Sequence, residues 1–102
     1  MPTAIQHTVV FSLRHLSGSP EEGDFLAAAR SLATIPGVED FRQLRQVSPK
    51  SPFTFFFTML FADDAAYQAY NNHPTHTAFV RDRWEPEVSA FQELDFVALD
   101  AI

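Results

Sequence analysis

The stretch FTFFFTMLF, at residues 53–61, is the strongest predicted strand in the chain. It is apolar at nearly every position, whereas a strand with one face in water alternates apolar and polar side chains. We therefore expect this strand to be covered on both faces. The preceding loop, SPKSP at residues 48–52, contains two prolines that cannot donate to a β-ladder. It separates the apolar strand from a more polar predicted strand at residues 38–47.

Two further strands are predicted at the ends of the chain. Residues 5–13 alternate, with His7, Val9 and Phe11 on one face and polar residues, apart from Val10, on the other. Residues 93–99 alternate in the same way, with Leu94 and Phe96 on a common face. Together with residues 38–47 and 53–61, these segments predict a four-stranded sheet.

The first predicted helix begins at a capping box. Ser19 is a typical N-cap, Pro20 suits the first helical position, and Glu22 stands three residues after the cap. The helix should end at Ile35-Pro36-Gly37, because the residue before proline avoids the α conformation and glycine turns the chain.

The second helical region is predicted in two pieces. Asp63 and Asp64 begin a short helix that runs through Tyr70 and stops before the sequence NNHP at residues 71–74. Thr75 is expected to cap the next piece, in which apolar residues follow His76 at intervals of four. Pro86 lacks an amide hydrogen, which predicts a kink near residues 83–85. Phe91 is assigned to a helix face.

The resulting order, βαββαβ, predicts one ferredoxin-like α+β domain over residues 1–102. In this fold two helices cover one face of a four-stranded antiparallel sheet. The other face would be left uncovered, although residues 53–61 and Val10 make it apolar. We therefore expect the chain to form a homodimer in which two sheets pack face to face, as a dimeric α+β barrel.

Composition excludes several classes of function. The chain has 102 residues, of which 7 are Lys or Arg and 13 are Asp or Glu, so its net charge is −6. This surplus of acid argues against nucleic-acid binding. The absence of cysteine excludes thiolate metal sites and cysteine nucleophiles. No apolar run reaches the roughly 20 residues that span a membrane, and no signal peptide is recognised, so we expect a cytoplasmic protein.

Histidine and tyrosine are the candidate catalytic residues. His76 lies at the margin of the predicted buried stripe and Tyr70 precedes the helix break, so the two could share a proton, with His76 as base. His7 is either a core imidazole bonded to a carbonyl or hydroxyl, which sequence favours, or a pocket residue. His73 is interpreted as part of the helix stop. His7 and His76 alone do not make a metal site, because no third ligand is identifiable.

The same residues carry a resemblance to a known family. The strand at residues 5–11, the IPGV turn at 35–38, Phe53-Thr54, Ala69-Tyr70 and the HPTHTAFV segment at 73–80 resemble the stress-responsive A/B barrel domain (Dabb) family. The resemblance covers nearly the whole chain. It implies a dimeric ferredoxin-like protomer with a pocket between sheet and helices. Most members have no assigned reaction.

A plant polyketide cyclase of this family works without a cofactor. The resemblance implies that its catalytic Tyr and His correspond to Tyr70 and His76, and that a first-strand His corresponds to His7. A further His of that enzyme corresponds to Phe55, which departs from the pattern. We assign His7, Phe11 and Phe55 to ligand binding, and expect no cofactor or metal.

Two functions remain open from the sequence. The first is a homodimer of unassigned reaction that binds a small apolar or aromatic ligand. The alternative is a cofactor-independent enzyme, similar to a polyketide cyclase or a lyase, that uses Tyr70 and His76. The sequence does not decide whether the protein is an enzyme.

Overall fold

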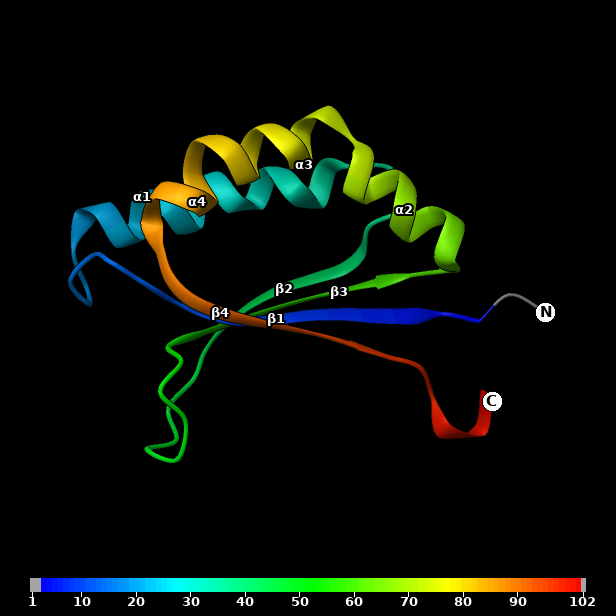
Figure 1. Ribbon diagram of the computed structural model, residues 1–102, viewed down its shortest axis with the longest axis horizontal. Helices are drawn as coiled ribbons and strands as arrows, with labels where there is room; N and C mark the ends of the chain where they lie inside the picture. The colour runs from blue at the N-terminus through cyan, green and yellow to red at the C-terminus, as the bar shows by residue number, and fades with distance from the viewer. Residues whose placement is uncertain (1–2, 102) are drawn as a thin grey trace.

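A computed structural model describes residues 3–101 and places the helices in one layer above a single sheet (Figure 1). The sheet is antiparallel, with strand order β2-β3-β1-β4, so β1 and β3 lie at its centre. The four strands are β1 (Ile5–Leu13), β2 (Glu39–Arg45), β3 (Phe55–Phe61) and β4 (Val88–Phe96). The predicted ferredoxin-like order of strands and helices is therefore confirmed.

The helices occupy two parts of the chain. Between β1 and β2, α1 (Pro20–Ala29) continues into the 3₁₀ turn η1 (Arg30–Thr34). Between β3 and β4 the chain forms α2 (Asp64–Asn72), α3 (Pro74–Phe79), the π-helical turn η2 (Val80–Trp84) and the short α4 (Glu85–Glu87). A last 3₁₀ turn, η3 (Leu99–Ala101), follows β4. None of the helices in residues 3–101 is long and apolar enough to cross a membrane.

The predicted helix starts are confirmed at Ser19 and Asp63. The Ser19 hydroxyl accepts a hydrogen bond from the Glu22 amide at 3.2 Å, and Asp63 accepts one from the Ala66 amide at 2.8 Å. The second half of the capping box is absent, because the Glu22 carboxylate is buried and instead pairs with Arg45 on β2 at 2.8 Å. This ion pair ties α1 to the edge of the sheet.

Three sequence predictions near the second helical region are wrong. His73, not Thr75, caps α3, and its Nδ1 accepts the Thr75 amide at 3.1 Å because Pro74 occupies the first helical position. The last strand begins at Val88 rather than at residue 93 and ends at Phe96. Phe91 consequently belongs to β4 and not to a helix face.

The irregularity predicted from Pro86 takes the form of a wide turn. The segment from Val80 to Trp84 is π-helical, and α4 follows for only three residues before β4 begins. A proline cannot donate to the carbonyl four residues earlier, so the regular ladder is interrupted there. The widened segment carries Val80 and Trp84 over the sheet.

Register determines which side chains face the helices. His7 lies opposite Met59, Val9 opposite Phe57, and Phe11 opposite Phe55, and directly opposed residues share a face of the sheet. Phe11, Phe25, Phe57 and Phe61 are fully buried there, and the Phe11 and Phe57 rings meet edge to face at 4.7 Å. This covered face holds the core.

The opposite face of the sheet is apolar and has no helix over it (Figure 1). Phe56 and Leu60 on β3 are half-buried, and Leu44, Leu94 and Phe96 are 40–52% exposed. The sequence prediction that residues 53–61 are apolar on both faces is therefore confirmed for β3. We call this surface the open face, defined by Val10, Leu44, Phe56, Leu60, Leu94 and Phe96.

Candidate functional site

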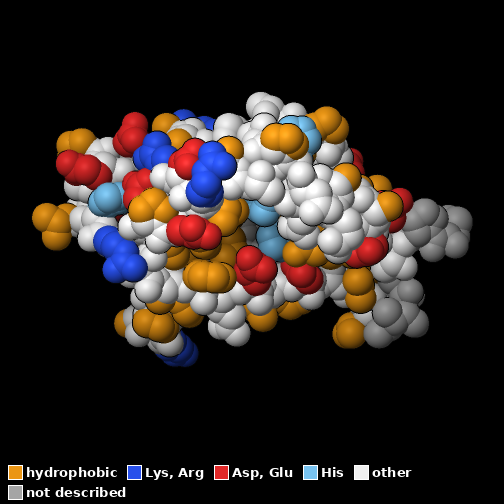
Figure 2. Space-filling view, turned by 45° about the horizontal axis from the view of Figure 1, so that its top comes forward, with side chains coloured by type: hydrophobic (Ala, Val, Ile, Leu, Met, Phe, Trp, Pro, Cys, Tyr) orange, Lys and Arg blue, Asp and Glu red, His pale blue; other side chains and the backbone are white. Residues whose placement is uncertain are grey.

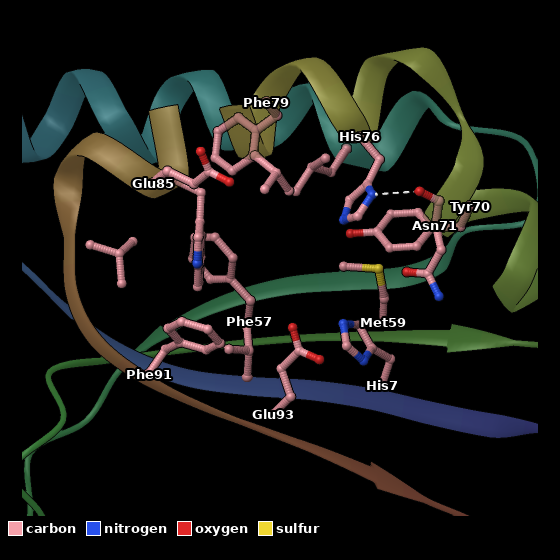
Figure 3. A pocket seen from close by; sticks show the side chains of 15 residues that line it. His7, Phe57, Met59, Tyr70, Asn71, His76, Phe79, Glu85, Phe91 and Glu93 are labelled. Carbon is pink, nitrogen blue, oxygen red and sulfur yellow. Dashed lines mark hydrogen bonds between the residues drawn. The ribbon is translucent and has the colours of Figure 1, made fainter. Parts of the chain in front are cut away.

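A cavity of about 530 Å³ lies between the covered face and the segment from α2 to α4. Figure 2 shows a hollow in this region, with apolar and histidine side chains inside and acidic side chains along its edge. Figure 3 shows the lining from close by. The lining side chains are His7, Val9, Leu32, Phe57, Met59, Tyr70, Asn71, His76, Phe79, Val80, Trp84, Glu85, Val88, Phe91 and Glu93.

His76 is held in one tautomer by the backbone. Its Nδ1–H donates to the Asn71 carbonyl oxygen at 3.0 Å across the break between α2 and α3 (Figure 3). This bond leaves Nε2 as the basic nitrogen, and no other residue between 3 and 101 forms a hydrogen bond with it. Burial lowers the pKa of His76, although the bond to Asn71 acts in the opposite direction. The ring is therefore neutral near pH 7 and able to accept a proton.

Tyr70 stands next to His76. The two ring centroids are 4.4 Å apart, and the tyrosine is only 2% exposed. Its hydroxyl forms no hydrogen bond with another described residue, and Figure 3 shows it pointing into the cavity. Because every fully buried polar side-chain atom in residues 3–101 has a partner, the hydroxyl oxygen is open to the cavity. Burial, followed by the charges of Tyr67 and Glu93, raises the pKa of Tyr70. The hydroxyl therefore remains a hydrogen-bond donor at neutral pH.

His7 belongs to a cluster with Tyr67 and Asp95. Its Nδ1–H donates to Asp95 Oδ1 at 2.6 Å, and the Tyr67 hydroxyl donates to Asp95 Oδ2 at 2.9 Å while lying 2.9 Å from His7 Nδ1. Burial and the bond to Asp95 raise the pKa of Tyr67. The cluster fixes the His7 ring, and with Nδ1 occupied by Asp95 and Tyr67, Nε2 is the nitrogen left for the cavity. His7 is thus both hydrogen-bonded in the core, as sequence favoured, and part of the lining.

The structure brings together three of the five residues chosen from the sequence. His7, Tyr70 and His76 meet at one end of the cavity, which we call the polar end. Phe11 and Phe55 lie in the core, 0% and 3% exposed, and are not part of the lining. Phe11 packs against Phe25 and Trp84, and Phe55 lies under the Arg45 guanidinium.

Several residues in or beside the cavity are not identified from the sequence. Asp95 and Glu93 lie on β4 and face the helices because they oppose His7 and Val9 of β1. The alternation of residues 93–99 puts Glu93 and Asp95 on one face, and the pairing of β4 with β1 determines that this face is turned toward the helices. Trp84 stands eight residues after His76, which places it on the same stripe. Val80 and Trp84 both line the cavity.

A metal is not suggested by these groups. Among the described residues, no set of three histidine or acidic side chains is arranged to hold a metal ion. The groups that could bind a ligand's polar atoms are the Tyr70 hydroxyl as donor and the imidazole Nε2 atoms of His7 and His76. A proton could pass between such a ligand and His76, with Tyr70 bound to an oxygen.

The sequence-family model of the stress responsive A/B barrel domain, Dabb, matches residues 5–98. The chain belongs to the Dabb family. A Dabb family protein with a ferredoxin-like fold from Mesorhizobium loti MAFF303099 is 57% identical, with a TM-score of 0.94 over 95% of this chain and 98% of that one. No curated protein matches the sequence.

More distant structures share the fold with this Dabb chain. Hydroxynitrile lyase from Passiflora edulis is 13% identical, with a TM-score of 0.83 over 100% of this chain and 99% of that one. A dimeric ferredoxin-like protein of unknown function from Thermobifida fusca YX is 18% identical, with a TM-score of 0.77 over 96% and 93%. At these identities the likeness concerns the fold alone, and one fold can host unrelated functions.

Proposed function

We propose that this protein is a homodimer that binds a small, mainly apolar ligand in the cavity between sheet and helices. The observation that carries the proposal is the hydroxyl of Tyr70, which belongs to a residue that is 2% exposed, forms no hydrogen bond with another of residues 3–101 and points into the cavity. Since every fully buried polar side-chain atom of the described residues has a partner, this hydroxyl oxygen is open to the cavity, and a ligand atom that accepts a hydrogen bond fits this position.

The cavity suits such a ligand in size and character. Its volume of about 530 Å³ falls within the range of small-molecule sites, which are mostly apolar with a few placed polar groups. Phe57, Met59, Phe79 and Trp84 supply the apolar surface, and His7, Tyr70 and His76 lie together at one end. The ligand would place its apolar body along the aromatic side chains and its polar atom at Tyr70.

The homodimer is supported by the open face. The open face has apolar residues on all four strands, and a continuous apolar surface of this kind is typical of an association surface. The Thermobifida fusca protein, which shares the fold, is described as dimeric. Because the cavity lies on the covered face, pairing of two open faces would leave it accessible. A cytoplasmic location stays a prediction.

Acid–base catalysis is a second candidate, favoured by the state of His76. A neutral imidazole with its Nδ1–H held by a carbonyl presents a basic Nε2 beside a protonated phenol. His76 would remove a proton from the ligand while Tyr70 donates to a developing oxyanion, without a cofactor. Phe55 lies in the core, so the further histidine of the plant cyclase has no counterpart in the lining. This difference argues for a lyase or another proton transfer rather than for cyclisation.

Ligand binding is tested by filling the cavity. Val80→Phe adds a ring to a half-buried lining position, and Leu16→Phe adds the same ring at an 82% exposed position outside the cavity. We expect 2-acetylnaphthalene to bind the wild type and the Leu16 variant in calorimetry and to bind the Val80 variant at least about tenfold more weakly. Equal binding to all three proteins would contradict the proposed site.

A further inference from the structure

The charges that line the cavity have one sign. Glu85 on α4 and Glu93 on β4 are both lining residues, and no lysine or arginine is among the side chains that line it. Glu93 points into the cavity from the sheet, with Glu85 on the helical side (Figure 3). Within residues 3–101, neither carboxylate forms an ion pair or a side-chain hydrogen bond. Their negative charge is therefore not neutralised by a neighbouring cation.

Arg83, which stands two residues before Glu85, does not supply that cation. Its guanidinium pairs with Glu87 at 2.6 Å and with Asp24 at 2.7 Å, and it is not a lining residue. Two imidazoles also line the cavity, but His7 is already paired with Asp95 at 2.6 Å, and burial lowers the pKa of His76. A negatively charged ligand would thus enter the cavity without a positive partner.

The negative charge of Glu93 acts at the polar end itself. Burial and the charge of Tyr67 contribute most to the raised pKa of the Tyr70 phenol, and the charge of Glu93 adds to it, so Glu93 also disfavours a negative charge at the tyrosine oxygen. A ligand carboxylate bound to the Tyr70 hydroxyl would place its charge beside that oxygen and experience the same repulsion. Removing a carboxylate from water without a cationic partner is unfavourable.

An uncharged carbonyl group avoids this cost. Its oxygen accepts the hydrogen bond of the Tyr70 hydroxyl, which points into the cavity from a residue that is 2% exposed and forms no hydrogen bond with another of residues 3–101. The aromatic lining favours a ligand with a flat aromatic body. Trp84 and Phe91 both line the cavity and meet edge to face at 5.6 Å, and Phe91 is 52% exposed, which leaves part of its ring free to pack against a ligand ring.

We propose that the cavity selects an uncharged aromatic carbonyl compound, and that Glu85 and Glu93 are specificity-determining residues that exclude the corresponding carboxylic acid. This inference rests on the proposed ligand binding and adds the class of ligand to it. A cationic analogue is accepted, because the two carboxylates and the aromatic faces both attract positive charge.

The experiment compares three probes of similar size by calorimetry at pH 8 and low salt. They are 2-acetylnaphthalene, the anion 2-naphthoate and the cation 1-(2-naphthyl)ethylammonium. We expect the wild type to bind the ketone and the cation at least about tenfold more tightly than 2-naphthoate, a difference of about 1.4 kcal/mol. Raising the salt concentration should reduce the difference between the cation and the anion.

The double variant Glu85→Gln/Glu93→Gln tests the residues assigned to this selection. We expect it to bind 2-naphthoate more tightly than the wild type and to reduce the preference for the ketone to within about threefold. The matched control is Glu21→Gln, which removes the same type of charge from an exposed position on α1 outside the cavity lining. The control should keep the wild-type preference. Circular dichroism checks that both variants fold.

The outcomes separate this inference from the proposed function. If 2-naphthoate binds the wild type as tightly as the ketone, or the double variant keeps the wild-type preference, the charge selection is wrong while ligand binding stands. If none of the three probes binds the wild type with a Kd below about 1 mM, the proposed ligand site itself is overturned.

Discussion

The two faces of the sheet use similar residues in opposite ways. On the covered face, the apolar rings of Phe11, Phe57 and Phe61 are buried by helices, and polar groups such as His7 have hydrogen-bond partners. On the open face, Phe56 and Phe96 have no helix above them, and Thr8 and Thr58 are the buried polar residues. The covered face therefore holds the core and the cavity of the single chain, whereas the open face is an uncovered apolar surface that the proposed dimer would bury.

The largest expected effect is the loss of a covered-face ring. Phe11→Ala removes a fully buried phenyl group from contact with Phe25, Phe57 and Trp84. Because it leaves a cavity, we expect the free energy of unfolding to fall by about 3–5 kcal/mol in urea denaturation. Leu16→Ala, at an exposed position, should change it by less than about 0.5 kcal/mol. A loss below about 1 kcal/mol for Phe11 would remove the distinction between the two faces.

A charge on the open face should abolish association and leave the fold intact. Phe56→Asp places a carboxylate at the centre of that face, where a partner sheet could not solvate it. We expect light scattering to give twice 11.5 kDa for the wild type and 11.5 kDa for the variant. Leu16→Asp, outside the sheet, should remain dimeric. A monomeric wild type at micromolar concentration would show that the open face has another role.

The polar cluster of the covered face should have a moderate effect. Asp95→Asn removes the charged acceptor shared by His7 and Tyr67. Because one side of Asp95 is in water, we expect a loss of about 1–2 kcal/mol in the free energy of unfolding and weaker binding of 2-acetylnaphthalene. Asp100→Asn, in the exposed η3 turn, is the matched control. Unchanged stability and binding in the Asp95 variant would show that the cluster does not position His7.

The smallest effect is the pH dependence that His76 contributes. Its pKa in the folded chain lies below the unfolded value of about 6.5, so the unfolded chain binds a proton first as the pH falls. The stability due to the neutral ring is complete above about pH 6.5 and is lost as the pH falls through the lower folded pKa. Denaturation of the wild type and of His76→Gln between pH 8 and pH 5 should therefore converge at the acidic end. Parallel curves would contradict the shift.

Sequence periodicity predicted the elements well wherever one face was clearly apolar. The alternation of residues 5–13, and the double-sided apolar character of residues 55–61, follow from burial, which a single strand records in its own side chains. The start of β4 could not be predicted in this way. Residues 88–92 follow a proline and a π-helical turn, so their backbone is set by pairing with β1 and not by a local pattern.

The residues of the site were likewise predicted only where a local sequence pattern marks them. Tyr70 and His76 flank a helix break that the sequence marks, and His7 lies on a strand whose inward face is evident. Asp95 and Tyr67 join His7 only through strand register and the position of α2, and both are far from it in sequence. Phe11 and Phe55 are assigned to ligand binding from the sequence, but they are buried in the core and do not line the cavity.

The acceptor that fixes the His76 ring is the main-chain carbonyl of Asn71. Every amino acid at position 71 carries that carbonyl, so no point substitution there can delete it. The orientation of the imidazole is instead inherited with the path of the chain from Tyr70 to Pro74. Side chains around the cavity, Asn71 included, can consequently change to suit a new ligand while the basic nitrogen keeps its place.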